Sequence, residues 1–143
     1  MKLLVINGPN LNFLGIREKS VYGTENYDDL LRMIQEKAEA EGCQIEVFQS
    51  NHEGAIIDRI QDAYFDGTDA IVINPAAYTH TSIAIPDAIK AVGIPAVEVH
   101  LSDISKREAY RQISYVSDVA VKTIYGKGFE GYKEAIEYLE KSL

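Results

Sequence analysis

Five short apolar runs recur along the sequence, and each is followed by a longer segment with a different pattern. They occupy residues 3–6, 45–48, 70–73, 96–99 and 119–124. Most are nearly continuous in apolar residues and rich in Val and Ile. Such runs are typical of strands that are buried on both faces of a parallel sheet. This feature restricts the chain to α/β architectures in which helices cover both sides of the sheet.

Helical patterns fill the segments between these runs. Asn26 is placed to cap a helix that ends at Gly42. Asp28 and Asp29 lie in its first turn, where the helix dipole favours negative charge. Further helices are expected over 56–63 (ending before Gly67), over 85–92 (ending at Gly93, with its start left open by Pro86), around 107–113 and over 131–143. The alternation predicts a flavodoxin-like, doubly wound, five-stranded parallel sheet with helices on both faces, in the strand order 2-1-3-4-5 by analogy.

Composition narrows the possible partners. The chain has 143 residues, which fits a single domain over 1–143. It carries 14 Lys and Arg against 22 Asp and Glu, a net charge of −8. Nucleic acids and anionic membranes both require a positive face, so neither is expected as a partner. Cys43 is the one Cys and cannot form an intrachain disulfide, and no apolar run is long enough for a membrane span or signal peptide, so a cytoplasmic protein is expected.

Polar side chains gather just after the predicted strands, where ligands bind in folds of this class. They are Asn7, Asn10, Asn12, Arg17 and Tyr22 after the first strand, Asn51, His52 and Glu53 after the second, Asn74, Tyr78 and His80 after the third, and His100, Ser102, Arg107 and Arg111 after the fourth. All three His residues follow strand ends, which favours a functional site. The connection from Asn7 to Asn26 is long for this position and is typical of a lid or binding loop.

Some of these residues also have simpler interpretations. Asn7 and Asn10 are ordinary turn residues, and His52 can cap the helix that follows it. Arg107 and Arg111 are four positions apart, so they would share one face of a short helix that meets either solvent or an anion. A metal site built from His52, Glu53, His80 and His100 is an alternative, although these residues contain no close-spaced His pair.

A glycine motif at 126–131 resembles a cofactor-binding loop. It reads Gly-Lys-Gly-Phe-Glu-Gly, follows a predicted strand and precedes a helix. A dinucleotide fold then needs another strand with an acidic residue about twenty positions on, but only the last predicted helix follows Gly131. We therefore expect no dinucleotide cofactor and interpret these glycines as a tight turn into a closely packed helix.

Several longer motifs occur in a fixed order. They are I-N-G-P-N-L-N at 6–12, R-E at 17–18, Y-G at 22–23, Q-S-N-H-E-G at 49–54, I-N-P-A-A-Y-T-H-T-S at 73–82 and V-E-V-H-L-S at 97–102. With Arg107, Arg111 and segment 126–132, they resemble type II 3-dehydroquinate dehydratases over essentially the whole chain. The resemblance implies anti elimination of water from 3-dehydroquinate, giving 3-dehydroshikimate in the shikimate pathway. It also implies a flavodoxin-like fold, no cofactor or metal, and a homododecamer built from trimers.

The resemblance also assigns roles to individual positions. Tyr22 matches the family's base, Arg17 the residue that supports the ionised tyrosine, and His100 the general acid. Asn12 matches a residue that helps to hold a water near the developing enolate. The substrate-binding positions are Asn74, His80, Leu101, Ser102 and Arg111, and Asp87 matches an acidic residue that reaches a neighbouring subunit's site.

Elementary electrostatics adds Arg107 to this set. A free tyrosine has a pKa of about 10, so a tyrosine base near neutral pH needs a fall of roughly three units. A cation about 4 Å away supplies ~4 kcal/mol at an effective dielectric of ~20, which is about that much. Because burial opposes the shift, Arg107 is expected to contribute besides Arg17.

The alternative function is a non-enzymatic flavodoxin-like binding or receiver module. A receiver needs an acidic pair after the first strand and an Asp after the third, but Asn7-Gly8 and Asn74-Pro75 stand there. A flavin binder needs a Ser/Thr-rich phosphate loop after the first strand, and this is also missing.

Overall fold

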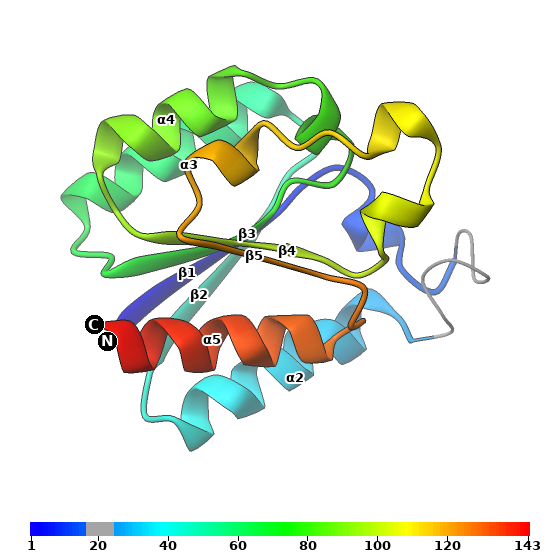
Figure 1. Ribbon diagram of the computed structural model, residues 1–143. Coiled ribbons are helices and arrows are strands. Elements are labelled where there is room, and N and C mark those ends of the chain that lie inside the picture. Colours follow the sequence, from blue (N-terminus) through cyan, green and yellow to red (C-terminus); the bar gives the residue numbers. More distant parts are fainter. Residues whose placement is uncertain (17–24) are drawn as a thin grey trace.

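A computed structural model describes residues 1–16 and 25–143 of the chain. These residues form a parallel sheet of five strands in the order β2-β1-β3-β4-β5. The strands are β1 (Lys2–Asn7), β2 (Gln44–Gln49), β3 (Ala70–Asn74), β4 (Ala96–His100) and β5 (Lys122–Tyr125). Helices α3 (Glu53–Phe65) and α4 (Ala84–Val92) cover one face, and α2 (Tyr27–Ala40) and α5 (Glu130–Ser142) cover the other (Figure 1). The predicted doubly wound, flavodoxin-like fold and its strand order are confirmed.

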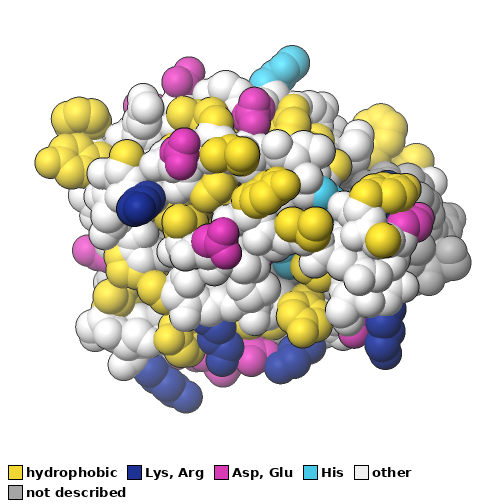
Figure 2. Space-filling view, turned by 45° about the horizontal axis from the view of Figure 1, so that its top comes forward, with side chains coloured by type: hydrophobic (Ala, Val, Ile, Leu, Met, Phe, Trp, Pro, Cys, Tyr) yellow, Lys and Arg dark blue, Asp and Glu magenta, His cyan; other side chains and the backbone are white. Residues whose placement is uncertain are grey.

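Hydrophobic side chains are exposed on the face that carries α3 and α4, which Figure 2 turns toward the reader. On α3, Tyr64 is 62% and Phe65 83% exposed, and Ile83 just before α4 is 62% exposed. The rings of Tyr64 and Phe65 meet edge to face with their centroids 5.1 Å apart. Among the described residues, no helix is both long and apolar enough to cross a membrane. The α3–α4 face thus carries large apolar side chains in contact with solvent.

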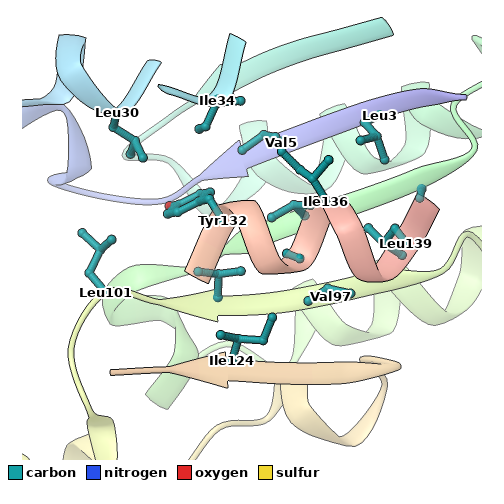
Figure 3. Close-up of a cluster of buried hydrophobic side chains, with 14 of the residues drawn as sticks. Leu3, Val5, Leu30, Ile34, Val97, Leu101, Ile124, Tyr132, Ile136 and Leu139 are labelled. Carbon is teal, nitrogen blue, oxygen red and sulfur yellow. The ribbon is translucent and has the colours of Figure 1, made fainter. Parts of the chain in front are cut away.

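Side-chain alternation along the strands divides the core into two layers. Leu3 and Val5 of β1 pack toward α2 and α5, where Tyr132 and Ile136 meet them (Figure 3). The intervening residues, such as Leu4, pack toward α3 and α4. Because both faces are covered, the strands are rich in apolar residues, and β1 and β3 are nearly continuous in them, as the sequence pattern predicts.

The apolar runs end in polar residues at one edge of the sheet. Asn7 ends β1, Asn74 ends β3 and His100 ends β4. All three are buried. Because the strands are parallel, these carboxyl ends lie side by side, and Asn7 pairs in register with Asn74. The fold thus gathers polar groups where ligands bind in open α/β sheets.

Helix α2 begins as predicted. The Asn26 side chain accepts a hydrogen bond from the Asp29 backbone N–H at 2.9 Å, and the Asp29 carboxylate accepts one from the Asn26 N–H at 3.0 Å. This reciprocal capping satisfies two backbone donors. Pro86 lies in the first turn of α4, where its missing N–H breaks no helical hydrogen bond.

Two predicted elements are wrong in detail. The fifth strand begins at Lys122 rather than at residue 119, because the N–H groups of Val119 and Ala120 both bond to the Val116 carbonyl. In place of the helix expected around 107–113, the structure has one short 3₁₀ turn at 109–111, and Arg107 before it is extended, with φ −89° and ψ −177°. The described 3₁₀ helices are η1 (Leu11–Phe13), η2 (Ala76–His80), η3 (Ile104–Lys106), η4 (Ala109–Arg111) and η5 (Val116–Asp118).

Candidate active site

A cavity of about 130 Å³ lies at the carboxyl ends of β1, β3 and β4. Among the residues that line it are Asn74, His80, His100, Leu101, Ser102, Arg107 and Arg111. The sequence predicts all of these as site residues, and they come from three separate segments of the chain. The fold brings them together in one hollow, together with backbone of the connection that follows β1.

His100 and Glu98 form a buried pair in the cavity wall. They are two positions apart in β4 and therefore face the same side of the sheet. The Nε2 atom of His100 contacts the Glu98 carboxylate. Glu98 also accepts hydrogen bonds from Ser114 Oγ at 2.5 Å, Ser117 Oγ at 2.7 Å and Thr123 Oγ1 at 3.1 Å. Four donors thus compensate the desolvation of a carboxylate that is 0% exposed.

These contacts keep Glu98 ionised. Burial alone raises the pKa of Glu98, but the hydrogen bond and charge of His100 and the bonds from Ser114 and Ser117 outweigh it, and the net pKa lies below its usual value. Because the carboxylate holds Nε2, it fixes the orientation of the ring. The Nδ1 atom of His100 has no hydrogen-bond partner within 1–16 and 25–143, so it is the nitrogen that a ligand can reach.

Glu98 is a site residue that the strand-end pattern misses, although the sequence carries a signal for it. It is an acidic residue inside an otherwise apolar strand, two positions before a His. A buried charge at that spacing places the carboxylate beside the imidazole.

His80 is held in one tautomer. Its Nδ1 lies 2.8 Å from the Ile113 carbonyl oxygen, which can only accept, so Nδ1 carries the proton and Nε2 of the neutral ring is an acceptor. Burial lowers the pKa of His80, and the positive charges of Arg107 and Arg111 lower it further against the effect of the Ile113 bond. His80 is therefore neutral near pH 7 and offers an acceptor to a ligand hydroxyl.

Two guanidinium groups give the cavity positive charge. Arg107 Nη1 donates to Ser102 Oγ at 3.3 Å, and Arg107 Nε lies 3.8 Å from the Glu108 carboxylate. Arg111 Nε lies 3.0 Å from the same carboxylate, and its guanidinium carbon is 5.3 Å from the centre of the Tyr110 ring. The two Arg both line the cavity, but they do not lie on one helix. The prediction that they share a helix face is therefore wrong. Their joint charge suits an anionic ligand.

The glycine motif braces the Leu101–Ser102 backbone. The N–H of Gly128 donates to the Leu101 carbonyl and the N–H of Gly126 to the Ser102 carbonyl, each at 3.0 Å. In a trans peptide the N–H points opposite to the carbonyl, so the Ser102 N–H points away from the glycine segment. Gly131 is also tightly placed, since a Cβ there would lie 3.2 Å from Val99 Cγ1. The expected close turn is confirmed, and it serves this backbone.

Other predicted residues lie elsewhere. Asn12 is exposed on η1, and its Oδ1 accepts from Gln49 Nε2 at 3.4 Å, outside the cavity lining. Asp87 is exposed in the first turn of α4 and does not line the cavity. Arg17 and Tyr22 fall outside the described residues.

The fold does not assemble the alternative metal site. His52 occupies the N-cap position of α3 without a side-chain capping bond. Within the described ranges, no three His, Cys, Asp or Glu residues come together in a way that could hold a metal ion. His52, Glu53, His80 and His100 therefore do not form one ligand set.

Comparison with known proteins identifies relatives of this chain. The family model described as dehydroquinase class II matches residues 1–140. A 3-dehydroquinate dehydratase of Lachnoclostridium phytofermentans is 57% identical over 137 residues, covering 96% of this chain and 94% of the relative. One of Thermotoga maritima is 50% identical over 143 residues, covering 100% and 97%.

Solved structures give the same relationship. The type II dehydroquinase of Butyrivibrio crossotus superposes with a TM-score of 0.96 at 57% identity, covering 97% of each chain. A 3-dehydroquinate dehydratase-like protein of Bifidobacterium longum has a TM-score of 0.72 at 30% identity, covering 99% of this chain and 96% of the other. The chain whose strand ends build this cavity belongs to the class II dehydroquinase family.

Proposed function

We propose that this protein dehydrates 3-dehydroquinate to 3-dehydroshikimate in the shikimate pathway. A base removes the proton from C2, the C3 carbonyl takes up charge as an enolate, and the C1 hydroxyl leaves as water after it receives a proton. The observation that carries the proposal is a His100 ring oriented by a buried carboxylate in a cavity that also holds Arg107 and Arg111.

His100 is the proposed general acid. It must hold its ring steadily against the departing hydroxyl, and the Glu98 carboxylate supplies this orientation. The Glu98 carboxylate also occupies Nε2, which leaves the other ring nitrogen for the substrate. Nδ1 is therefore the nitrogen proposed to protonate the C1 oxygen.

The other cavity residues are proposed to bind the substrate. Arg107, Arg111 and the Ser102 N–H suit the carboxylate, because two cations and a backbone donor converge there. His80 presents an acceptor to a substrate hydroxyl, and Asn74 contributes its carboxamide. Leu101 supplies backbone to the same wall.

Tyr22 and Arg17 are the proposed base and its cationic support, and Asn12 is proposed to help to hold a water near the enolate. These roles rest on family membership and motif position, since Arg17 and Tyr22 lie outside the described residues. Asp87 is proposed to reach the site of a neighbouring subunit in a homododecamer built from trimers, because its exposed position on α4 is free of the cavity of its own chain. A cytoplasmic location fits this biosynthetic role. Membership of a family whose relatives are named as enzymes argues against the non-enzymatic alternative.

The test combines substrate, chelator and one variant. The purified protein is mixed with 3-dehydroquinate, with and without excess chelator, and the conjugated enone product is followed by its absorbance. We expect equal rates in both samples. No product would refute the reaction, and loss of rate with chelator would support a metal-dependent mechanism.

Tyr22→Phe is expected to abolish turnover with an unchanged circular dichroism spectrum, and near-normal turnover would remove Tyr22 as the base.

A further inference from the structure

A hydrogen-bonded chain of four side chains runs beneath the cavity. Asn74 Nδ2 donates to the Tyr132 hydroxyl at 3.0 Å, and that hydroxyl donates to Asn7 Oδ1 at 2.7 Å. Asn7 Nδ2 in turn donates to the Tyr27 hydroxyl at 3.3 Å. Tyr132 and Asn7 are 0% exposed and Asn74 is 3% exposed. Water is therefore excluded from the centre of this chain.

The fold brings these residues together from distant parts of the sequence. Asn7 and Asn74 are register partners at the ends of β1 and β3, so their side chains leave the same face of the sheet. Tyr132 lies in the first turn of α5 on that face. Figure 3 shows its hydroxyl pointing away from Ile136 and Leu139, toward the edge where the strands end. The rest of its ring packs in the apolar layer.

The direction of every bond in the chain follows from one backbone group. The Ala76 N–H donates to the Asn74 side chain at 3.1 Å, and because an N–H can only donate, the atom that faces it must be Oδ1. Asn74 therefore turns Nδ2 toward Tyr132, whose hydroxyl must accept there. The hydroxyl proton is then left for Asn7, whose buried Oδ1 would otherwise be unpaired.

This arrangement decides what Asn74 presents to a ligand. One of its two N–H groups is used by Tyr132, and one side of Oδ1 is used by Ala76. The second N–H and the second lone pair remain for the cavity that Asn74 lines. Without the Tyr132 hydroxyl, the bond to Ala76 would be the only hydrogen bond on the carboxamide from residues 1–16 and 25–143.

We propose that Tyr132 is a positioning residue that fixes the Asn74 carboxamide for binding the substrate. It acts through Asn74 and does not itself line the cavity. The proposal rests on the proposed function for its kinetic consequence, but the orientation of Asn74 in the ligand-free protein can be measured independently.

The first test is spectroscopic and needs no substrate. In the unsubstituted protein we expect a Tyr132 hydroxyl proton that exchanges slowly enough to be seen by NMR, with a nuclear Overhauser contact to the Asn74 side-chain amide. A freely exchanging hydroxyl without that contact would overturn the proposal, whether or not the protein turns over 3-dehydroquinate. Inactivity of the unsubstituted protein would instead count against the proposed function.

The second test is a double-mutant cycle on activity. Tyr132→Phe is expected to lower kcat/KM about tenfold, which corresponds to the free energy of one lost hydrogen bond. The assay is run well below the melting temperature of the variant. In an Asn74→Ala background the same change should have no further effect on kcat/KM. If the two losses multiply instead, Tyr132 does not act through Asn74 and the proposal fails.

A matched control separates positioning from general destabilisation. Thr68→Val removes a buried hydroxyl that donates to Asp66 Oδ1 at 2.6 Å just before β3, at the opposite end of that strand. We expect it to lower the melting temperature while leaving kcat/KM unchanged. If Thr68→Val lowers kcat/KM as much as Tyr132→Phe does, the effect of Tyr132→Phe is due to lost stability alone, and the positioning role is refuted.

Discussion

Glu98 is the residue whose role is most clearly set by its surroundings. An ionised carboxylate that is 0% exposed is stable only because His100 and three hydroxyls satisfy it. Glu98→Gln keeps the shape but removes the negative charge that His100 Nε2 contacts. We expect kcat to fall about 10²-fold, at the lower end of what general acid catalysis contributes, with an altered pH–rate profile. Glu46→Gln, at an exposed ion pair with Arg59, is the control and should leave the profile unchanged.

The same residue makes stability depend on pH in a definite direction. The pKa of Glu98 is lower in the folded protein than its ordinary value, so its contribution is fully present above the unfolded pKa, which is near 4.3. It is lost as pH falls through the lower, folded-state pKa. Urea unfolding should therefore show a stability gap between wild type and Glu98→Gln at pH 7 that shrinks below about pH 4. A gap that widens with acid would contradict an ionised Glu98.

Arg111 carries the prediction about anion binding. Its guanidinium lines the cavity with side-chain exposure of 29%, so its charge is only partly screened by water. Removing a charged hydrogen-bond donor of this kind weakens binding roughly 10- to 100-fold. We expect Arg111→Ala to raise KM for 3-dehydroquinate by that factor, measured by steady-state kinetics. Arg32→Ala removes an exposed guanidinium on α2 and should not change KM; an unchanged KM in Arg111→Ala would place the anion pocket elsewhere.

At the scale of elements, the β5–α5 turn supports the backbone of the site without lining the cavity. Gly126 has φ +78°, and a Cβ there would lie 3.2 Å from the Asp103 Cβ. Gly126→Ala should push the adjoining Leu101–Ser102 backbone by a few tenths of an ångström. We expect KM to rise roughly three- to tenfold, less than the ~10²-fold that a 1 Å misplacement can cause.

Gly93 provides the matched comparison for this turn. It has φ +69° and open space around its Cβ position, so Gly93→Ala carries the same backbone strain without the push. Both variants should lose about 1 kcal/mol of unfolding free energy, measured by urea denaturation. Only Gly126→Ala should change KM. Equal kinetic effects in the two would show that the turn does not brace the binding backbone.

The elements themselves were predictable because their signals are local. The Asn26 capping box and the apolar runs of β1 and β3 depend on neighbours in sequence. The start of β5 was not predictable. Val119 has a side chain typical of strands, but its N–H donates to the Val116 carbonyl in the η5 turn and not to a neighbouring strand. Segment 107–113 has helical spacing, but its extended Arg107 interrupts any helix.

In the site too, some residues are predictable from the sequence and others are not. Strand-end residues such as His80 and His100 could be read from their positions, because parallel strands bring their carboxyl ends together. Tyr132 could not, since a buried tyrosine looks like any packed aromatic until the partners of its hydroxyl are known. Those partners lie 58 and 125 residues away. Residues that act through a neighbour are thus visible only after folding.

At the scale of the whole molecule, the site works against the charge of its own chain. The net charge of −8 repels an anionic substrate at long range. Arg107 and Arg111 place two cations at the cavity, where low dielectric strengthens their fields. The Debye length of about 8 Å at physiological ionic strength confines the repulsion of distant surface carboxylates. Substrate capture therefore depends on the local arrangement more than on the global charge.

Assembly is the remaining prediction at this scale. The α3–α4 face exposes Tyr64, Phe65 and Ile83, and Asp87 on α4 lies outside the cavity of its own chain. We expect sedimentation to give a particle of about 190 kDa, twelve chains of 15.9 kDa, and activity per chain to fall on dilution below its dissociation range. Asp87→Asn should lower kcat/KM severalfold without unfolding the chain if Asp87 reaches a neighbour's site as proposed, whereas Glu36→Gln on the exposed side of α2 should not. A fully active monomer at working concentration would remove the role given to Asp87, since a single chain would then supply every group that the reaction needs.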